Sequence, residues 1–149
     1  MTKVDLQKEI FETIENATDK FDQIILCGYP PFLKDIVELG EKRGINWKSL
    51  NVKLLFAAEA FSEEFREYMA RAAGLKNIYR DMTNIYGTAD RGTMALETPL
   101  SILIRHLTLQ KNAMRHIFPE ASRTPTLTQY NPLFIHFSAS EKNILLTAS

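Results

Sequence analysis

Two short apolar runs, each followed by a helix-like pattern, constrain the fold of this chain more than any other feature. Residues 21–27 read Phe-Asp-Gln-Ile-Ile-Leu-Cys, and residues 52–56 read Val-Lys-Leu-Leu-Phe. Apolar residues that run consecutively, rather than alternating, are typical of a parallel sheet with helices over both faces. The pattern therefore predicts an α/β fold: an open, mainly parallel sheet flanked by helices.

Helices are predicted before and after these strands. Apolar residues recur at helical spacing over residues 4–16. Pro30 and Pro31 suit the first turn of a second helix, and Ser62 is a good N-cap for a third. Repeated strand–helix units with right-handed crossovers place the carboxyl ends of the strands at one edge of the sheet, where ligands bind.

The last third of the chain changes character. Thr98 begins a helix that is predicted to continue until Pro119, with an apolar face of Leu100, Leu103, Ile104 and Leu107. Residues 125–132 are proline-bounded and predicted to be extended.

Two strands of a hairpin are then predicted, at residues 133–137 and 143–147. Because no helix separates them, they are expected to begin a second, antiparallel layer. The predicted organisation is an α/β subdomain over residues 1–132 and the first strands of a following β subdomain over residues 133–149.

Composition narrows the function classes. The 149 residues include 18 basic and 18 acidic side chains without a block of like charge, which gives no support to nucleic-acid or anionic-membrane binding. The single cysteine, Cys27, excludes an internal disulfide framework and a multi-cysteine zinc site, and is predicted to be a small buried apolar group. No apolar run is long enough to span a bilayer, so the expected location is cytoplasmic.

A candidate ligand loop follows the third β-prone run, at residues 84–90. Tyr86 offers a flat aromatic face, Gly87 permits φ > 0 and close approach of a ligand, and Asp90 could help to hold Mg²⁺ against phosphates. On these residues alone, a plain strand-to-loop corner with Tyr86 packed and Asp90 solvated is the better interpretation, because short motifs match by chance. The 57–61 connection is predicted at the same sheet edge, which strengthens the case for a site.

The order of four segments resembles the phenylacetate–CoA ligase-like branch of the adenylate-forming (AMP-binding) enzymes. Residues 28–33 are similar to a proline-containing turn of that branch, Ala-Ala-Glu-Ala-Phe at 57–61 to its Gly-Ala-Glu-Pro-Trp, and Asn-Ile-Tyr-Gly-Thr-Ala-Asp at 84–90 to its Asp-x-Tyr-Gly-x-Ser-Glu. Residues 128–132, with 145–147, resemble the stretch before the ribose-binding aspartate. The likeness runs from about residue 21 onward and favours the functional interpretation.

The resemblance implies an adenine site made by both loops. Tyr86 would stack on one face of the base, and Asn84 would meet its amino group. The other face would be lined by the loop residues Ala58, Glu59 and Ala60.

The same resemblance implies where the phosphates and the metal lie. Ile85 belongs to the nucleotide-binding segment, Gly87 and Thr88 would pass close to the α-phosphate, and Asp90 would hold Mg²⁺. In such enzymes a carboxylic acid attacks the α-phosphate of ATP to give an acyl-adenylate and pyrophosphate, and a thiol such as CoA then takes the acyl group.

The sequence departs from the family pattern in several places. Ala89 replaces a Ser or Thr, Ala60 replaces Pro, and Asp90 is one methylene shorter than Glu. No Ser/Thr/Gly-rich phosphate loop, ribose-binding aspartate or C-terminal catalytic lysine is found. The expectation is a fragment of a longer ATP-dependent acyl-CoA ligase that is inactive alone, binds AMP weakly and self-associates through an exposed docking surface.

Two other function classes stay open. One is a stand-alone, non-catalytic nucleotide-binding or regulatory module. The other is a flavodoxin-like or receiver-type domain, which ranks last because a receiver needs paired acidic residues where this chain has Cys27 and Gly28.

Overall fold

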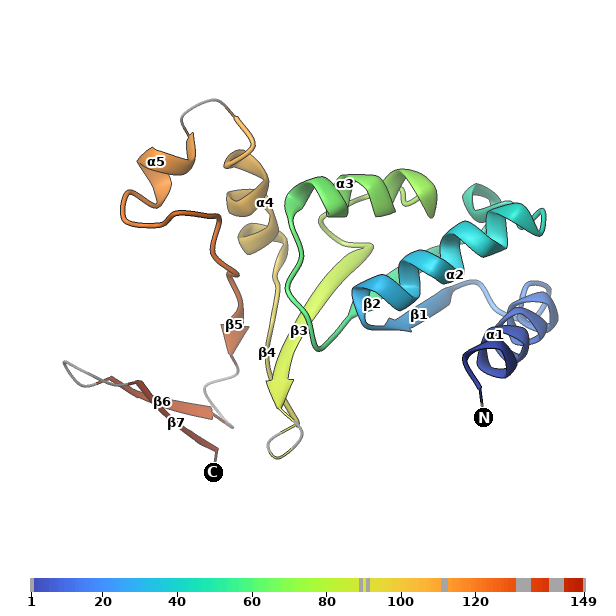
Figure 1. Ribbon diagram of the computed structural model, residues 1–149, viewed down its shortest axis with the longest axis horizontal. Coiled ribbons are helices and arrows are strands. Elements are labelled where there is room, and N and C mark those ends of the chain that lie inside the picture. The colour runs from blue at the N-terminus through green and yellow to red at the C-terminus, as the bar shows by residue number, and fades with distance from the viewer. Residues whose placement is uncertain are drawn as a thin grey trace.

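The predicted α/β architecture with a C-terminal hairpin is confirmed. The structure, a computed structural model, describes residues 2–88, 90, 92–110, 113–130, 135–139 and 144–148, the last two ranges by backbone alone. One five-stranded open sheet has the order β1 (Ile24–Gly28), β2 (Val52–Phe56), β3 (Met82–Thr88), β4 (Gly92–Leu96) and β5 (Gln129–Tyr130). The strands β6 (Ile135–Ala139) and β7 (Ile144–Ala148) form a separate antiparallel sheet (Figure 1).

The sheet is mixed. Strands β1, β2 and β3 pair in parallel, whereas β3, β4 and β5 pair antiparallel. Strand β3 therefore belongs both to the parallel part of the sheet, β1–β3, and to its antiparallel part, β3–β5. The helices are α1 (Lys3–Ala17), α2 (Pro30–Lys42), α3 (Glu63–Ala72), α4 (Pro99–Leu107) and α5 (Ala113–Ile117), with a short 3-10 turn at Trp47–Ser49.

The apolar core lies between the parallel strands and the first three helices. Cross-strand partners such as Leu26 and Leu54 share one face of the sheet, and that face meets α1, α2 and α3. Trp47 also packs in this core, and its indole Nε1 donates to the carbonyl of Val37 at 2.9 Å. The core residues are Phe11, Ile14, Leu26, Phe32, Leu33, Ile36, Val37, Trp47, Val52, Leu54, Phe56, Met69, Ala73 and Met82.

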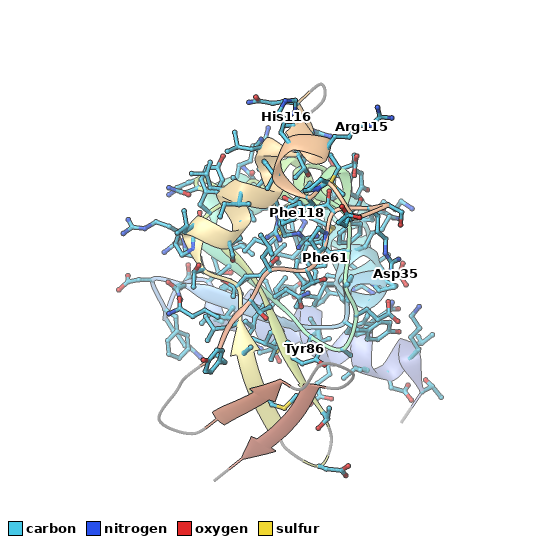
Figure 2. The ribbon with its side chains drawn as sticks, turned by 90° about the vertical axis from the view of Figure 1, so that its left-hand side faces the viewer. Asp35, Phe61, Tyr86, Arg115, His116 and Phe118 are labelled. Atoms are coloured by element: carbon cyan, nitrogen blue, oxygen red, sulfur yellow. The ribbon has the colours of Figure 1, made fainter. Side chains whose placement is uncertain are left out.

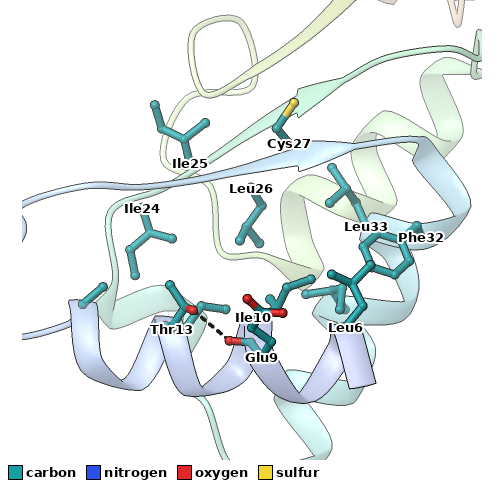
Figure 3. Close-up of a pocket in the computed structure, with 13 residues that line it drawn as sticks. Leu6, Glu9, Ile10, Thr13, Ile24, Ile25, Leu26, Cys27, Phe32 and Leu33 are labelled. Atoms are coloured by element: carbon teal, nitrogen blue, oxygen red, sulfur yellow. Dashed lines mark hydrogen bonds between the residues drawn. The ribbon is translucent and has the colours of Figure 1, made fainter. Parts of the chain in front are cut away.

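The opposite face of the sheet does not match the prediction of helices on both sides. Ile25 and Cys27 point away from α1, whereas Ile24 and Leu26 point toward it (Figure 3). Ile25 is 58% exposed and Cys27 is exposed, so the expectation that this cysteine is buried is wrong. On the described part of the chain, the helices leave an apolar strip of this face open.

Helix α4 is shorter than predicted and turns a different face to the protein. It ends at Leu107, where the Thr108 hydroxyl donates to the carbonyl of Arg105 at 2.6 Å, and α5 is a separate helix. The buried residues of α4 are Ile102 and Arg105. The predicted apolar face is largely open, since its members Leu100, Leu103 and Leu107 are exposed.

Strand β3 runs through the segment that was predicted to be a turn. The reversal comes instead between Thr88 and Gly92, and β4 then pairs with β3 across a bulge at Tyr86–Gly87. Gly87 does not have positive φ; a Cβ there would lie 2.1 Å from the carbonyl oxygen of Gly92. Close backbone packing is therefore the reason for this glycine. The predicted subdomain boundary at residue 132 lies outside the described residues.

No helix in the described ranges is long and apolar enough to cross a membrane.

Candidate functional site

The two predicted loops meet at one edge of the sheet. Asn84 lies beside Phe56, the last residue of β2, in the parallel register. Its side-chain Nδ2 donates to the carbonyl of Glu59 at 3.2 Å, which ties the 57–61 loop to β3. Asn84 is only 5% exposed, and its Oδ1 has no hydrogen-bond partner among the described residues.

Tyr86 stands on the same side of β3 as Asn84, because alternate residues of a strand share a face. Its side chain is 50% exposed, so an aromatic face is open to a ligand (Figure 2). Ile85 points to the opposite side, where its cross-strand partner is Leu96. The structure thus brings Asn84 and Tyr86 together and leaves Ile85 on the other face of the sheet.

The predicted loop residues Ala58, Glu59 and Ala60 are all exposed. Ala58 has φ of 72°, a left-handed conformation that alanine rarely adopts. Two carbonyl groups of this segment are held by buried side chains: Glu59 by Asn84, and Phe61 by Arg105 at 2.6 Å. The loop therefore has one defined path despite its exposure.

Gly87, Thr88 and Asp90 lie farther along, at the exposed end of the β3–β4 hairpin. Ala89, the position of the missing hydroxyl, lies outside the described residues. Across the part of the chain that the structure describes, no three His, Cys, Asp or Glu side chains gather in a way that could hold a metal ion. Asp90 is exposed, so its carboxylate is accessible from solvent.

A cluster of four charged side chains fills the interior between α3, β4 and α4. Glu63 and Arg66 come from α3, Glu97 follows β4, and Arg105 comes from α4; their side chains are at most 3% exposed. Arg66 Nε donates to Glu63 Oε2 at 2.9 Å, and Arg66 Nη2 donates to Glu97 Oε1 at 2.6 Å. Two carboxylates and two guanidinium groups balance, as buried charges require.

Glu97 is the centre of this cluster. Its Oε1 also accepts from Arg105 Nη1 at 2.6 Å, and its Oε2 accepts the backbone N–H of Asn84 at 2.9 Å. The Arg66 guanidinium lies 4.8 Å from the centre of the Phe61 ring. The charged interior is therefore in direct contact with both segments of the candidate site.

A cavity of about 920 Å³ lies next to the 57–61 loop, between the start of α3, the end of α4 and residues 120–126. Its size is within the range of small-molecule sites. The lining includes Ala60, Phe61 and Arg105, together with the hydroxyl-bearing residues Ser62, Thr108, Ser122, Thr124 and Thr126. Tyr86 and Asp90 do not line it, so only one side of the predicted site borders this cavity.

Asp81 fixes the segment that leads into β3. Its carboxylate accepts from Lys53 Nζ at 2.6 Å and from the backbone N–H groups of Lys76 and Asn77 at 3.1 and 2.8 Å. Burial alone raises the pKa of Asp81, but the hydrogen bonds from Lys53 and the backbone outweigh it and leave that pKa below its usual value.

Sequence reasoning missed the charged cluster, although one signal was present. Arg66 lies three residues before Met69 and Arg105 three residues after Ile102, so each arginine shares a helix face with a buried apolar residue. Arginine at such a position must find buried anions, and the structure shows that these are Glu63 and Glu97.

No protein-family model matches this sequence, and no curated protein matches it.

Proposed function

We propose that this chain binds the adenine nucleotide of ATP or AMP, as part of an ATP-dependent ligase that activates a carboxylic acid and passes it to a thiol such as CoA. One observation carries the nucleotide part: the Asn84 side chain holds the Glu59 carbonyl while Tyr86, two residues on, leaves an aromatic face open. The ligase class is supported by the order of the motifs in the sequence.

The geometry suits a planar base. Tyr86 supplies a ring for stacking, and the exposed loop at Ala58 to Ala60 supplies a wall beside it. Aromatic stacking and a few polar contacts with the loop contribute only a few kcal/mol, part of which offsets the cost of immobilising the ligand. We therefore expect AMP to bind to this chain in about the millimolar range.

The phosphate side of the site is less complete. The six glycines are spread along the chain without forming a phosphate loop, and Asp90 is the acidic residue that would hold Mg²⁺ against the phosphates. We expect the purified chain to bind AMP without releasing pyrophosphate from ATP. Self-association through an exposed docking surface stays a prediction.

An NMR titration with AMP tests the nucleotide proposal. Amide shifts should cluster at Ala58, Asn84 and Tyr86, and Tyr86→Ala should weaken binding about fivefold to 150-fold, because stacking on an aromatic ring is worth about 1–3 kcal/mol per base. The matched control is Tyr29→Ala: Tyr29 is 44% exposed, similar to Tyr86, but stacks on Phe32 beside β1. Its removal should change the dissociation constant by less than about twofold, since it lies outside both loops of the site.

Two results would contradict the proposal. Shifts confined to other residues, or equal losses in both tyrosine variants, would remove Tyr86 from the site. Rapid pyrophosphate release from ATP and a carboxylic acid by the purified chain would show that the assignment of missing catalytic elements is wrong.

A further inference from the structure

Two of the buried charges join the halves of the candidate site through one continuous set of contacts. Arg105 Nη2 donates to the carbonyl of Phe61 at 2.6 Å, and Arg105 Nη1 donates to Glu97 Oε1 at 2.6 Å. Glu97 Oε2 in turn accepts the backbone N–H of Asn84 at 2.9 Å. The loop after β2 and the strand β3 are thus linked by two side chains that themselves lie outside both motifs.

This link is rigid. The Glu97 side chain has no exposed surface and that of Arg105 is 3% exposed, so water does not compete for their hydrogen bonds. Charge-assisted bonds of this kind are shorter and stronger than neutral ones, and the planar guanidinium fixes direction as well as distance. The Arg105–Glu97 pair accordingly helps to hold the separation between the Phe61 carbonyl and the Asn84 amide, together with the Asn84–Glu59 hydrogen bond and the pairing of β2 with β3.

We propose that Glu97 and Arg105 are positioning residues of the nucleotide site, which hold the 57–61 loop and Tyr86 at the spacing that an adenine ring requires. This inference rests on the proposed function and deepens it. Neither residue touches the base: each acts through the backbone of a residue that lies in the site or beside it. A shift of the loop relative to β3 would separate the two walls while leaving both of them intact.

The cluster offers a matched control in Glu63. Glu63 is as deeply buried as Glu97 and also pairs with both arginines, at 2.9 Å to Arg66 Nε and 3.3 Å to Arg105 Nε. Unlike Glu97, it makes no hydrogen bond to the backbone of the candidate site within the described residues. Loss of either carboxylate disturbs the charge balance equally, but only Glu97 carries the link.

The experiment compares Glu97→Gln with Glu63→Gln in the 149-residue chain. The amide introduced by Glu97→Gln can present its oxygen to the arginines or to the Asn84 N–H, but its N–H donors then face the other group, so one part of the link is lost. We expect AMP binding to weaken at least about tenfold in Glu97→Gln, which corresponds to about 1.4 kcal/mol, and less than about threefold in Glu63→Gln. Both variants should lose thermal stability to a similar degree.

A second readout does not depend on nucleotide. In the ligand-free chain, the amides of Asn84 and residues 59–61 should shift and exchange faster with solvent in Glu97→Gln, and stay near their wild-type values in Glu63→Gln. A role limited to stability would move both variants together. If Glu97→Gln does not fold, Arg105→Lys replaces it, since lysine keeps the charge but lacks the planar fork whose two nitrogens bond Phe61 and Glu97 in fixed directions.

The outcomes separate the two proposals. Equal effects of Glu97→Gln and Glu63→Gln on AMP binding, with Tyr86→Ala still weakening it selectively, would overturn the positioning role and leave the nucleotide proposal standing. Absence of AMP binding in the wild-type chain would overturn both. Selective loss of AMP binding and selective loosening of residues 59–61 in Glu97→Gln would establish the role of this pair.

Discussion

The parallel and antiparallel parts of this molecule are built around different interiors. Between β1–β3 and α1–α3 the buried side chains are almost all apolar, with Ile36, Leu54 and Phe56 among the most deeply buried. Between β3–β4, the start of α3 and α4, the interior holds two glutamates and two arginines instead. Strand β3 borders both interiors.

The two interiors contribute differently to the protein: one mainly to stability, the other mainly to fixed geometry. Apolar contacts have no preferred direction, so the first part gains stability from burial and tolerates swaps that keep volume. Buried ion pairs add little net stability compared with apolar packing, because desolvation offsets their attraction, but they have strict geometry. The charged interior lies beside the candidate site, where fixed geometry matters more than stability.

The largest expected loss of stability comes from removing one arginine of the charged interior. A substitution in the apolar interior on the same helix serves as the comparison. Arg66→Met leaves two buried carboxylates with one guanidinium, and should lower the free energy of unfolding by about 3–5 kcal/mol. Met69→Leu, three residues later on α3 and equally buried, should cost less than about 1.5 kcal/mol because volume is conserved. Urea denaturation measures both, and similar costs for the two variants would remove the contrast between the interiors.

A smaller loss of stability is expected when either of two glycines in the strands is replaced by alanine. In Gly87→Ala the new Cβ would lie 2.1 Å from the Gly92 carbonyl oxygen, a backbone atom, so the β3–β4 hairpin must shift, at about 1–3 kcal/mol. In Gly28→Ala, in the parallel part, the nearest atoms belong to the flexible Leu33 side chain at 3.3 Å, and the cost should stay below that of Gly87→Ala. Thermal unfolding ranks the two, and the reverse order would show that the hairpin backbone adapts.

The smallest effect is a pH dependence where the two parts join, at Asp81. Because its pKa is lowered in the folded protein, its contribution to stability is present above the unfolded value of about 3.9 and is lost as the pH falls through the folded pKa. Asp81→Asn should cost about 1 kcal/mol at about pH 7, because water reaches the 25% exposed Lys53 side chain and screens the pair, and it should flatten the acid limb. Denaturation near neutral pH and near pH ~3 checks this, since these values lie on either side of the titration. If the acid limb is unchanged, the loss of stability at low pH comes instead from other carboxylates with lowered pKa, such as Asp5 and Glu38.

The sequence predicts the parallel part better than the antiparallel part, and the reason is physical. The runs that became β1 and β2, and the caps at Ser62 and Thr98, are local signals that tertiary contacts did not override. In α4 the apolar periodicity pointed to Leu103, whereas the ion pairs of Arg105 turned the helix the other way. Partners that lie 8 and 44 residues away in the sequence hold that orientation, and hydrophobic spacing carries no information about them.

The position of the candidate site was also predicted only in part, because local sequence signals do not specify contacts between segments that are distant in the sequence. The strand–helix order predicts that the 57–61 and 84–90 segments lie at one sheet edge, and the register of β2 and β3 brings Asn84 beside the 57–61 loop. The structural reason for Gly87 was not found, because it depends on Gly92 across a hairpin that local propensity did not reveal. The open face at Ile25 depends on what packs against the sheet, which a consecutive apolar run does not specify.

Ala58 gives the 57–61 loop an unusual balance between strain and entropy. Its φ of 72° costs an alanine about 1–2 kcal/mol that a glycine would not incur. In the unfolded chain, however, alanine has fewer accessible backbone conformations than glycine. Less backbone entropy is therefore lost when the loop becomes ordered on folding. The residue therefore favours the one loop path that the Asn84 and Arg105 side chains hold over a loop that samples many conformations. For a wall that stands beside a flat ligand, a surface already in place costs less ordering on binding than one that must first be fixed.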